Sequence, residues 1–131
     1  MDGTTLEVIV VDDEPQITEL LSTYIQSLPG IHHVHAFNDP EEARAYLLQH
    51  GDSADVLVTD FKMPKFDGIQ LMKLVPGNAA KILISGYVSE IIEDNLRAIN
   101  AVFLEKPVSL KQLGALIGKA ATERAGRPCV L

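Results

Sequence analysis

Five short apolar stretches, separated by amphipathic ones, constrain the fold of this chain more than any other feature of its sequence. Four of them are almost continuously apolar and rich in β-branched residues, which is typical of strands buried on both faces of a parallel sheet. The fifth alternates between apolar and polar residues, which favours a strand at the sheet edge. The first four are Leu6–Val11, Ala54–Val58, Lys81–Ile84 and Ala101–Leu104, and the fifth is His33–Phe37.

The stretches between these runs carry helical spacing or a helix start signal. The clearest start is Asp39, a capping residue that is followed by Pro40 and two glutamates near the positive end of the helix dipole. The remaining helices are predicted from Pro15 to Leu28, from Asp67 to Leu74, over Ile91–Ile99 and from Ser109 onward.

Strand and helix thus alternate five times along the chain. This alternation predicts an α/β fold, in which helices cover both faces of a parallel sheet and the crossovers are right-handed. We expect a doubly wound, five-stranded parallel sheet in the flavodoxin-like order 2-1-3-4-5. One domain is predicted over residues 5–122, and residues 123–131 are predicted to form an irregular C-terminal tail.

The composition narrows the choice of partners and compartment. The chain has 131 residues and a formal net charge of −7. A duplex-DNA binder needs a basic surface to displace counterions, so we expect no direct nucleic-acid binding. No apolar run approaches the ~20 residues that span a bilayer, and the N-terminus lacks a signal-peptide pattern. The single cysteine, Cys129, cannot form an internal disulfide. Together, these features predict a cytoplasmic protein without a membrane partner.

Polar residues stand where the predicted strands end. Asp12 and Asp13 follow the first strand, and Asp60 follows the third. Ser85 follows the fourth strand and Lys106 the fifth. Ligands of doubly wound sheets bind beyond the carboxyl ends of the strands, at the switch in strand order. The fold prediction alone therefore brings three carboxylates, a hydroxyl and an ammonium group to one rim.

This set of side chains suits phosphoryl transfer. Crowded carboxylates repel one another unless one is protonated or a cation lies between them, and carboxylate oxygens are suitable ligands for Mg²⁺. A lysine binds phosphate as a compact point charge, and an aspartate can act as a nucleophile that forms an acyl phosphate. The rim thus holds a nucleophile, a metal site and a cation for the phosphoryl oxygens.

Four segments at these strand ends resemble the receiver domains of two-component response regulators. They are VVDDEP (Val10–Pro15), VTDFKMPKFDG (Val58–Gly68), ISG (Ile84–Gly86) and FLEKP (Phe103–Pro107). The resemblance covers roughly residues 5–122. Each segment alone is a weak signal, but four of them in order, each at a strand end, are specific.

The resemblance implies a role for each aspartate of the rim. Asp60 would be the phospho-acceptor. Asp13 and Asp60 would bind Mg²⁺ directly, together with the backbone carbonyl of Lys62, and Asp12 would act mainly through a metal-bound water.

The resemblance also implies a switch. Lys106 would pair first with the acceptor carboxylate and then with the phosphoryl group, and the Lys106–Pro107 peptide bond would be cis. Ser85 would move toward the phosphoryl group, and Phe103 would rotate inward. This would change the face made by the fourth helix, the fifth strand and the fifth helix.

The same resemblance implies the partners. A receiver takes its phosphoryl group from a histidine kinase or a phosphotransfer protein. It would signal through the altered face to an output protein or to a second copy of itself. It would catalyse only its own phosphorylation and dephosphorylation and act on no separate substrate.

Several features depart from the common pattern of the family. Ser85 lies only 25 positions after Asp60, which trims the third helix or the loop after it. Ser85 stands where threonine is more common, Phe103 lacks the hydroxyl of a tyrosine, and Lys62 places a cation two residues past the acceptor. None of these changes removes a required group.

Three other functions fit parts of the pattern. A haloacid dehalogenase-type phosphatase also uses an aspartyl nucleophile, but Lys62 occupies the position of its second aspartate. A flavodoxin-like cofactor site would need hydroxyl and glycine residues after the first strand, where Asp12 and Asp13 would repel a phosphate. A scaffold that uses the receiver fold without phosphorylation is the third, and an intact acidic pocket argues against it without excluding it.

Three histidines on the predicted edge strand could suggest a second metal site. On an alternating edge strand, His33 and His35 share one face, as two metal ligands require, and His32 is their neighbour in sequence. The sequence places no cysteine or third ligand nearby. We therefore interpret these histidines as a solvated edge.

Overall fold

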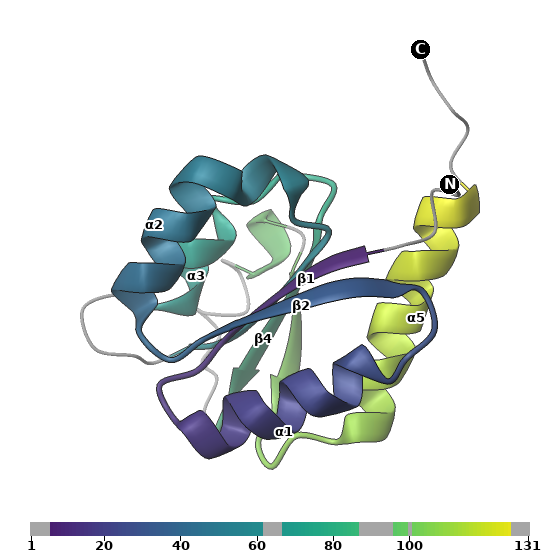
Figure 1. Cartoon of the computed structure of the whole chain (residues 1–131), viewed down its shortest axis with the longest axis horizontal. Helices are drawn as coiled ribbons and strands as arrows, with labels where there is room; N and C mark the ends of the chain where they lie inside the picture. Colours follow the sequence, from purple (N-terminus) through teal and green to yellow (C-terminus); the bar gives the residue numbers. More distant parts are fainter. Residues whose placement is uncertain (1–5, 62–66, 87–95, 100, 127–131) are drawn as a thin grey trace.

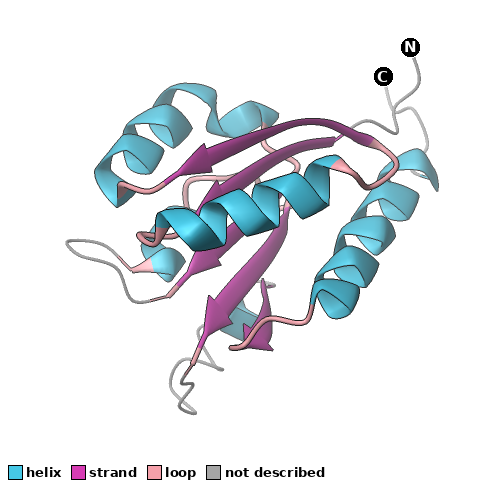
Figure 2. Cartoon of the chain, turned by 60° about the horizontal axis from the view of Figure 1, so that its bottom comes forward, coloured by secondary structure: helices cyan, strands magenta, loops and turns pink. Residues whose placement is uncertain are grey.

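The computed structural model describes residues 6–61, 67–86, 96–99 and 101–126. Its strands form one parallel sheet in the order β2-β1-β3-β4-β5, which confirms the prediction. The strand arrows in Figure 2 all run roughly the same way. The strands are β1 (Leu6–Val11), β2 (Ile31–Phe37), β3 (Val56–Asp60), β4 (Ala80–Ser85) and β5 (Ala101–Glu105).

Helices cover both faces of this sheet (Figure 1). On one face lie α1 (Pro15–Gln26) and α5 (Leu110–Gly126), and on the other lie α2 (Pro40–His50) and α3 (Gly68–Met72). A single 3-10 turn, η1 (Gly51–Ser53), follows α2, and β3 therefore begins later than the sequence predicts. In the part of the chain that the structure describes, no helix is both long and apolar enough to cross a membrane.

The inner strands contribute side chains to both layers of the core. In β1, Val8 and Val10 belong to the buried cluster that includes α1 and α5, whereas Ile9 and Val11 belong to the cluster that includes α2 and α3. Every residue of β3 is buried. These strands need continuous apolar sequence because neither of their faces meets water.

Local signals fix where the helices begin. Asp39 accepts a backbone N–H of the first turn of α2 at 2.9 Å, and Asp67 and Gln70 form a reciprocal capping box at the start of α3. The hydroxyl of Ser109 accepts a backbone N–H of the first turn of α5 at 3.2 Å. Each contact satisfies a donor that has no partner within its helix, so all three predicted starts are confirmed.

Three predicted helix ends were wrong. α1 ends at Gln26 rather than Leu28, because the N–H groups of Ser27 and Leu28 donate to carbonyls only three residues back. α3 stops at Met72 rather than Leu74, and the backbone N–H of Leu74 donates to the carbonyl of Leu71, three residues back, at 3.0 Å. α5 continues through Gly126, so the predicted irregular tail is helical in its first four residues, 123–126, which include good helix formers. The remaining residues of that tail, and most of the predicted helix over 91–99, lie outside the described residues.

Candidate functional site

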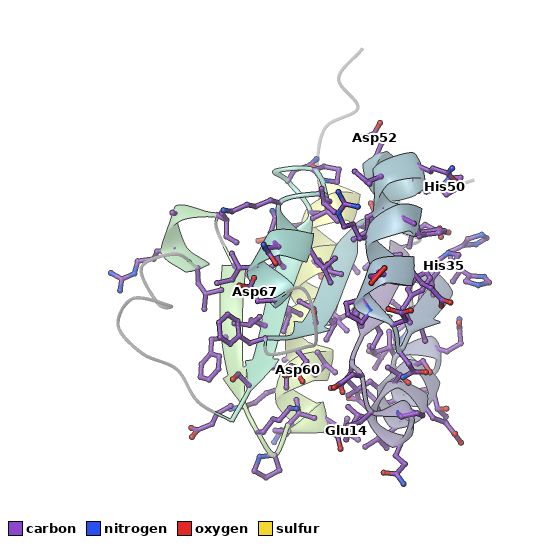
Figure 3. The ribbon with its side chains drawn as sticks, turned by 90° about the vertical axis from the view of Figure 1, so that its left-hand side faces the viewer. Glu14, His35, His50, Asp52, Asp60 and Asp67 are labelled. Atoms are coloured by element: carbon purple, nitrogen blue, oxygen red, sulfur yellow. The ribbon has the colours of Figure 1, made fainter. Side chains whose placement is uncertain are left out.

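Three aspartates converge at the carboxyl ends of β1 and β3. Asp60 is the last residue of β3, and Asp12 and Asp13 directly follow β1. One carboxylate oxygen from each lies within 4.8 Å of the others. Asp12 and Asp60 are only 2% and 8% exposed, whereas Asp13 is exposed. Figure 3 shows Asp60 at the same end of the molecule as Glu14, the residue that follows this aspartate pair.

Lys106 supplies a cation to the same rim. Its Nζ lies 3.3 Å from Oδ2 of Asp60 and 3.8 Å from Oδ2 of Asp12. The lysine follows β5 and is joined to Pro107 by a cis peptide bond, as predicted. Its backbone N–H donates to the carbonyl oxygen of Ser85 at 2.8 Å, which holds the end of β5 against β4. The two buried carboxylates therefore share one ammonium group.

Burial and mutual repulsion raise the pKa values of the buried carboxyl groups. Burial raises the pKa of Asp12 to about 6; the N–H of Glu14 lowers it and the charge of Asp60 adds to the rise. Burial also raises the pKa of Asp60, although Lys106 lowers it in part. Burial alone would lower the pKa of Lys106, but the carboxylates of Asp60 and Asp12 raise it. At both carboxyl groups, the effect of burial on the pKa thus outweighs the favourable charge of Lys106.

The donor set suits a hard divalent cation. Mg²⁺ prefers oxygen ligands, and a dication among Asp12, Asp13 and Asp60 would relieve the repulsion that favours protonation. Within the described residues, these are the one trio of potential metal-binding side chains whose ligand atoms already lie within 4.8 Å of one another. The predicted contribution of the Lys62 carbonyl lies outside the described residues.

Ser85 and Phe103, the two predicted switch residues, lie on the neighbouring strands β4 and β5. Ser85 ends β4, is 6% exposed, and pairs in register with Glu105 of β5. Phe103 lies opposite Leu83 in the same pair of strands, half-buried against the core cluster of α2 and α3. Ser85 thus lies at the carboxyl end of its strand, whereas Phe103 lies in the middle of β5, and the roles of both residues on phosphorylation stay predictions.

The sequence analysis missed two polar residues that hold the Asp12 segment. The side-chain amide of Asn38 donates to the carbonyl oxygen of Asp12 at 2.9 Å and to the hydroxyl of Thr18 at 2.7 Å. Thr18 is 4% exposed, on α1. A signal was available for Asn38, because it directly follows β2 and therefore lies at the same rim of the sheet.

Comparison with known proteins gives one family. Residues 8–118 match the family model described as the response regulator receiver domain. A protein-glutamate methylesterase/protein-glutamine glutaminase from Pseudomonas savastanoi pv. phaseolicola is 30% identical over 107 residues, which are 80% of this chain and 29% of that protein.

Solved structures agree with that match. The response regulator receiver protein from Pseudomonas putida is 28% identical, with a TM-score of 0.74, and the match covers 88% of this chain and 97% of that one. A receiver domain protein from Clostridium thermocellum is 25% identical, with a TM-score of 0.77 and coverage of 91% and 96%.

The matches also define how much of a longer protein this chain resembles. The chain spans less than a third of the first curated relatives that it matches, whereas it covers almost all of the solved receiver domains. The activity named for the longer relatives therefore does not transfer with the match. With its sheet order, its acidic rim and the family match over residues 8–118, the chain belongs to the receiver domains of two-component response regulators.

Proposed function

We propose that this receiver accepts a phosphoryl group on Asp60 from a histidine kinase or a phosphotransfer protein, with Mg²⁺ bound in the acidic pocket. The observation that carries the proposal is the setting of the Asp60 carboxylate. It is 3.3 Å from the ammonium group of Lys106 and is grouped with Asp12 and Asp13 within 4.8 Å. An oxygen nucleophile, a cation and carboxylates that can hold a metal are the parts that phosphoryl transfer requires.

In the proposed reaction, a carboxylate oxygen of Asp60 attacks the phosphorus of the donor. The new oxygen–phosphorus bond forms as the phosphorus–nitrogen bond of the donor phosphohistidine breaks, and the leaving imidazole takes up a proton. The backbone N–H of Phe61 donates to Oδ1 of Asp60 at 2.9 Å, which orients the carboxylate with Oδ2 toward Lys106.

Lys106, Asp12 and Asp13 would balance the charge of the phosphoryl group and of the metal ion. Lys106 would pair with the phosphoryl oxygens after transfer, as it pairs with the two carboxylates before it. Asp12 and Asp13 would hold the ion with Asp60. Mg²⁺, when bound, supplies positive charge that offsets the charge of the transferring group.

The same pocket supports a switch in an adjacent surface. The Ser85 hydroxyl would donate to a phosphoryl oxygen, and Phe103 would turn inward from β5, which biases an equilibrium between two conformers. The face of the fourth helix, β5 and α5 would change as a result. Val102 on β5 is already 44% exposed. This face would bind an output protein or a second copy of the chain.

Phosphorylation by a small donor tests the proposal. The chain is incubated with acetyl phosphate and Mg²⁺, and its intact mass is measured beside Asp60→Asn and a magnesium-free sample. The matched control is Asp52→Asn, because Asp52 is an exposed aspartate on η1. We expect one added phosphoryl group in the wild type and in Asp52→Asn, and none in the other two samples.

Two results would contradict the proposal. The first is an adduct that persists in Asp60→Asn. The second is the absence of any adduct together with no binding of beryllofluoride, an analogue that a competent pocket should capture even when hydrolysis is fast. The second result would instead favour a scaffold that uses the receiver fold without phosphorylation.

A further inference from the structure

A β-bulge in the edge strand β2 changes the face of the sheet toward which the histidines point. The two strands start in register, with Leu6 of β1 opposite Ile31 of β2, but the next residue, Glu7, lies opposite His33. His32 is therefore an extra residue in β2. In a bulge, two residues of one strand oppose a single residue of its partner, and side chains are re-aimed as a result.

The bulge reverses the alternation of side chains along β2. In a regular strand, Ile31 would share a face with His33 and His35. Instead, Ile31 packs with Val34 in the core cluster that includes α1 and α5. His32 and His33 therefore both turn toward the face covered by α2, where His35 already lies.

Glu7 stands between two of these histidines. Its Oε1 lies 3.0 Å from Nε2 of His35, and its Oε2 lies 3.6 Å from Nε2 of His32. Two ligands that are each about 2.0–2.1 Å from a tetrahedral metal lie about 3.4 Å apart. Each histidine lies near that spacing from a different oxygen of Glu7. The three groups are therefore neighbours, and a side-chain adjustment would bring both imidazoles and one carboxylate oxygen onto a single ion.

Aromatic neighbours hold the His35 ring in place. The ring of His33 lies with its centroid 4.2 Å away, and that of Tyr46 of α2 lies 5.1 Å away. The Tyr46 hydroxyl is 3.4 Å from His35 Nε2, on the nitrogen that faces Glu7. The His35 side chain is 26% exposed, and that of His32 is 66% exposed. One ligand is therefore preorganised, and the other is accessible and needs only a side-chain rotation.

We propose that Glu7, His32 and His35 bind a divalent transition-metal ion of the Zn²⁺ class, with water completing the coordination. Imidazole nitrogens with one carboxylate oxygen suit such ions, whereas an all-carboxylate pocket suits Mg²⁺. The site is separate from the phosphorylation pocket. Glu7 is the second residue of β1, whereas Asp12 follows its far end, and Figure 3 shows His35 away from Asp60.

Zn²⁺ binding by the whole chain tests this site. The chain is titrated with zinc chloride in a calorimeter at neutral pH, with excess Mg²⁺ to fill the acidic pocket. We expect one Zn²⁺ per chain and an affinity that falls by about tenfold or more in Glu7→Gln, His32→Gln and His35→Gln, since even the partners of metal ligands carry effects of that size.

The controls use His50 and the acidic pocket. The ring of His50, the last residue of α2, packs at a tilt against that of Tyr46, with the centroids 4.9 Å apart, and His50 is not one of the proposed ligands. His50→Gln and Asp60→Asn should therefore bind Zn²⁺ like the wild type. His32→Gln is the most informative variant, because His32 is exposed and its replacement removes a ligand but no core contact. Circular dichroism verifies that this variant is folded.

Three results would overturn the proposal. Unchanged Zn²⁺ affinity in a folded His32→Gln would remove this histidine from the site. An equal fall in His50→Gln would contradict the assigned ligands. Loss of binding in Asp60→Asn alone would place the ion in the acidic pocket instead.

Discussion

Replacing Asp12 by asparagine should stabilise the metal-free protein at neutral pH. Asp12 is 2% exposed, and burial raises its pKa from 3.8 to about 6. An acid with a raised pKa in the folded state favours folding while it is protonated. That contribution is complete below the unfolded value of 3.8 and is lost as the pH rises through about 6. At about 1.4 kcal/mol for each pH unit between the two values, ionised Asp12 lowers the free energy of unfolding by about 3 kcal/mol.

Asparagine retains most of the local contacts of Asp12. Its Oδ1 can accept the backbone N–H of Glu14, as the carboxylate does at 2.9 Å, and only the 3.8 Å contact with Lys106 is lost. We therefore expect Asp12→Asn to gain up to about 3 kcal/mol near pH 7.5 and about half of that near pH 5. Asp13→Asn is the matched control, and this exposed neighbour should change stability much less.

Urea denaturation followed by circular dichroism measures the difference at both pH values. The samples are first freed of metal with a chelator and then supplied with Mg²⁺. Added Mg²⁺ should raise the stability of the wild type more than that of Asp12→Asn, because a bound dication would offset the cost of the buried Asp12 charge. A gain of equal size at both pH values, or no gain, would refute the reasoning, since the charge of Asp12 would then not be what lowers stability.

Three further substitutions test contacts around the site and the core. Gly68→Ala should lower stability by about 1–3 kcal/mol, because a Cβ there would run into the backbone carbonyl oxygen of Asp60; thermal melting checks this, and a wild-type midpoint would contradict it. Gly114→Ala should cost less than this, because its Cβ would meet the hydroxyl at the far end of the Tyr24 side chain rather than backbone. Adding Tyr24→Phe should recover part of the loss in urea denaturation, and no recovery would exclude this clash as the cause. Lys81 is 4% exposed, and its Nζ donates to three backbone carbonyl oxygens at 3.2, 3.3 and 3.2 Å. Lys81→Met should therefore lower stability by about 1–3 kcal/mol and speed amide exchange over residues 77–80. Unchanged exchange would argue that the lysine does not hold this loop.

The sheet and its acidic rim were predictable because both depend on local sequence. A strand buried on both faces must be apolar throughout, and β1 was found at its predicted bounds, Leu6–Val11. Parallel strands end at the same edge of a sheet, so strand ends alone placed Asp12, Asp60, Ser85 and Lys106 together. The structure adds the distances and the burial that set the charge balance among them.

The bulge was not predictable in the same way. Side-chain alternation assumes one residue in β2 for each residue of β1, and His32 breaks that assumption. The break depends on how two strands distant in sequence pair, which leaves no mark within β2 itself. The sequence therefore predicted a solvated edge with two histidines on one face, and it missed Glu7 as their neighbour. The contact of Asn38 with Thr18 was missed for a related reason, since it joins a loop to a helix.

The extra residue in β2 also bears on how the protein behaves when concentrated. β2 is an outer strand of the sheet, and outer strands present backbone groups to which a strand of another molecule can add. A bulge twists an edge strand out of the flat geometry that pairing with another strand needs. Deleting His32 should straighten β2 and leave a regular edge strand, to which a strand of another molecule could pair and start aggregation.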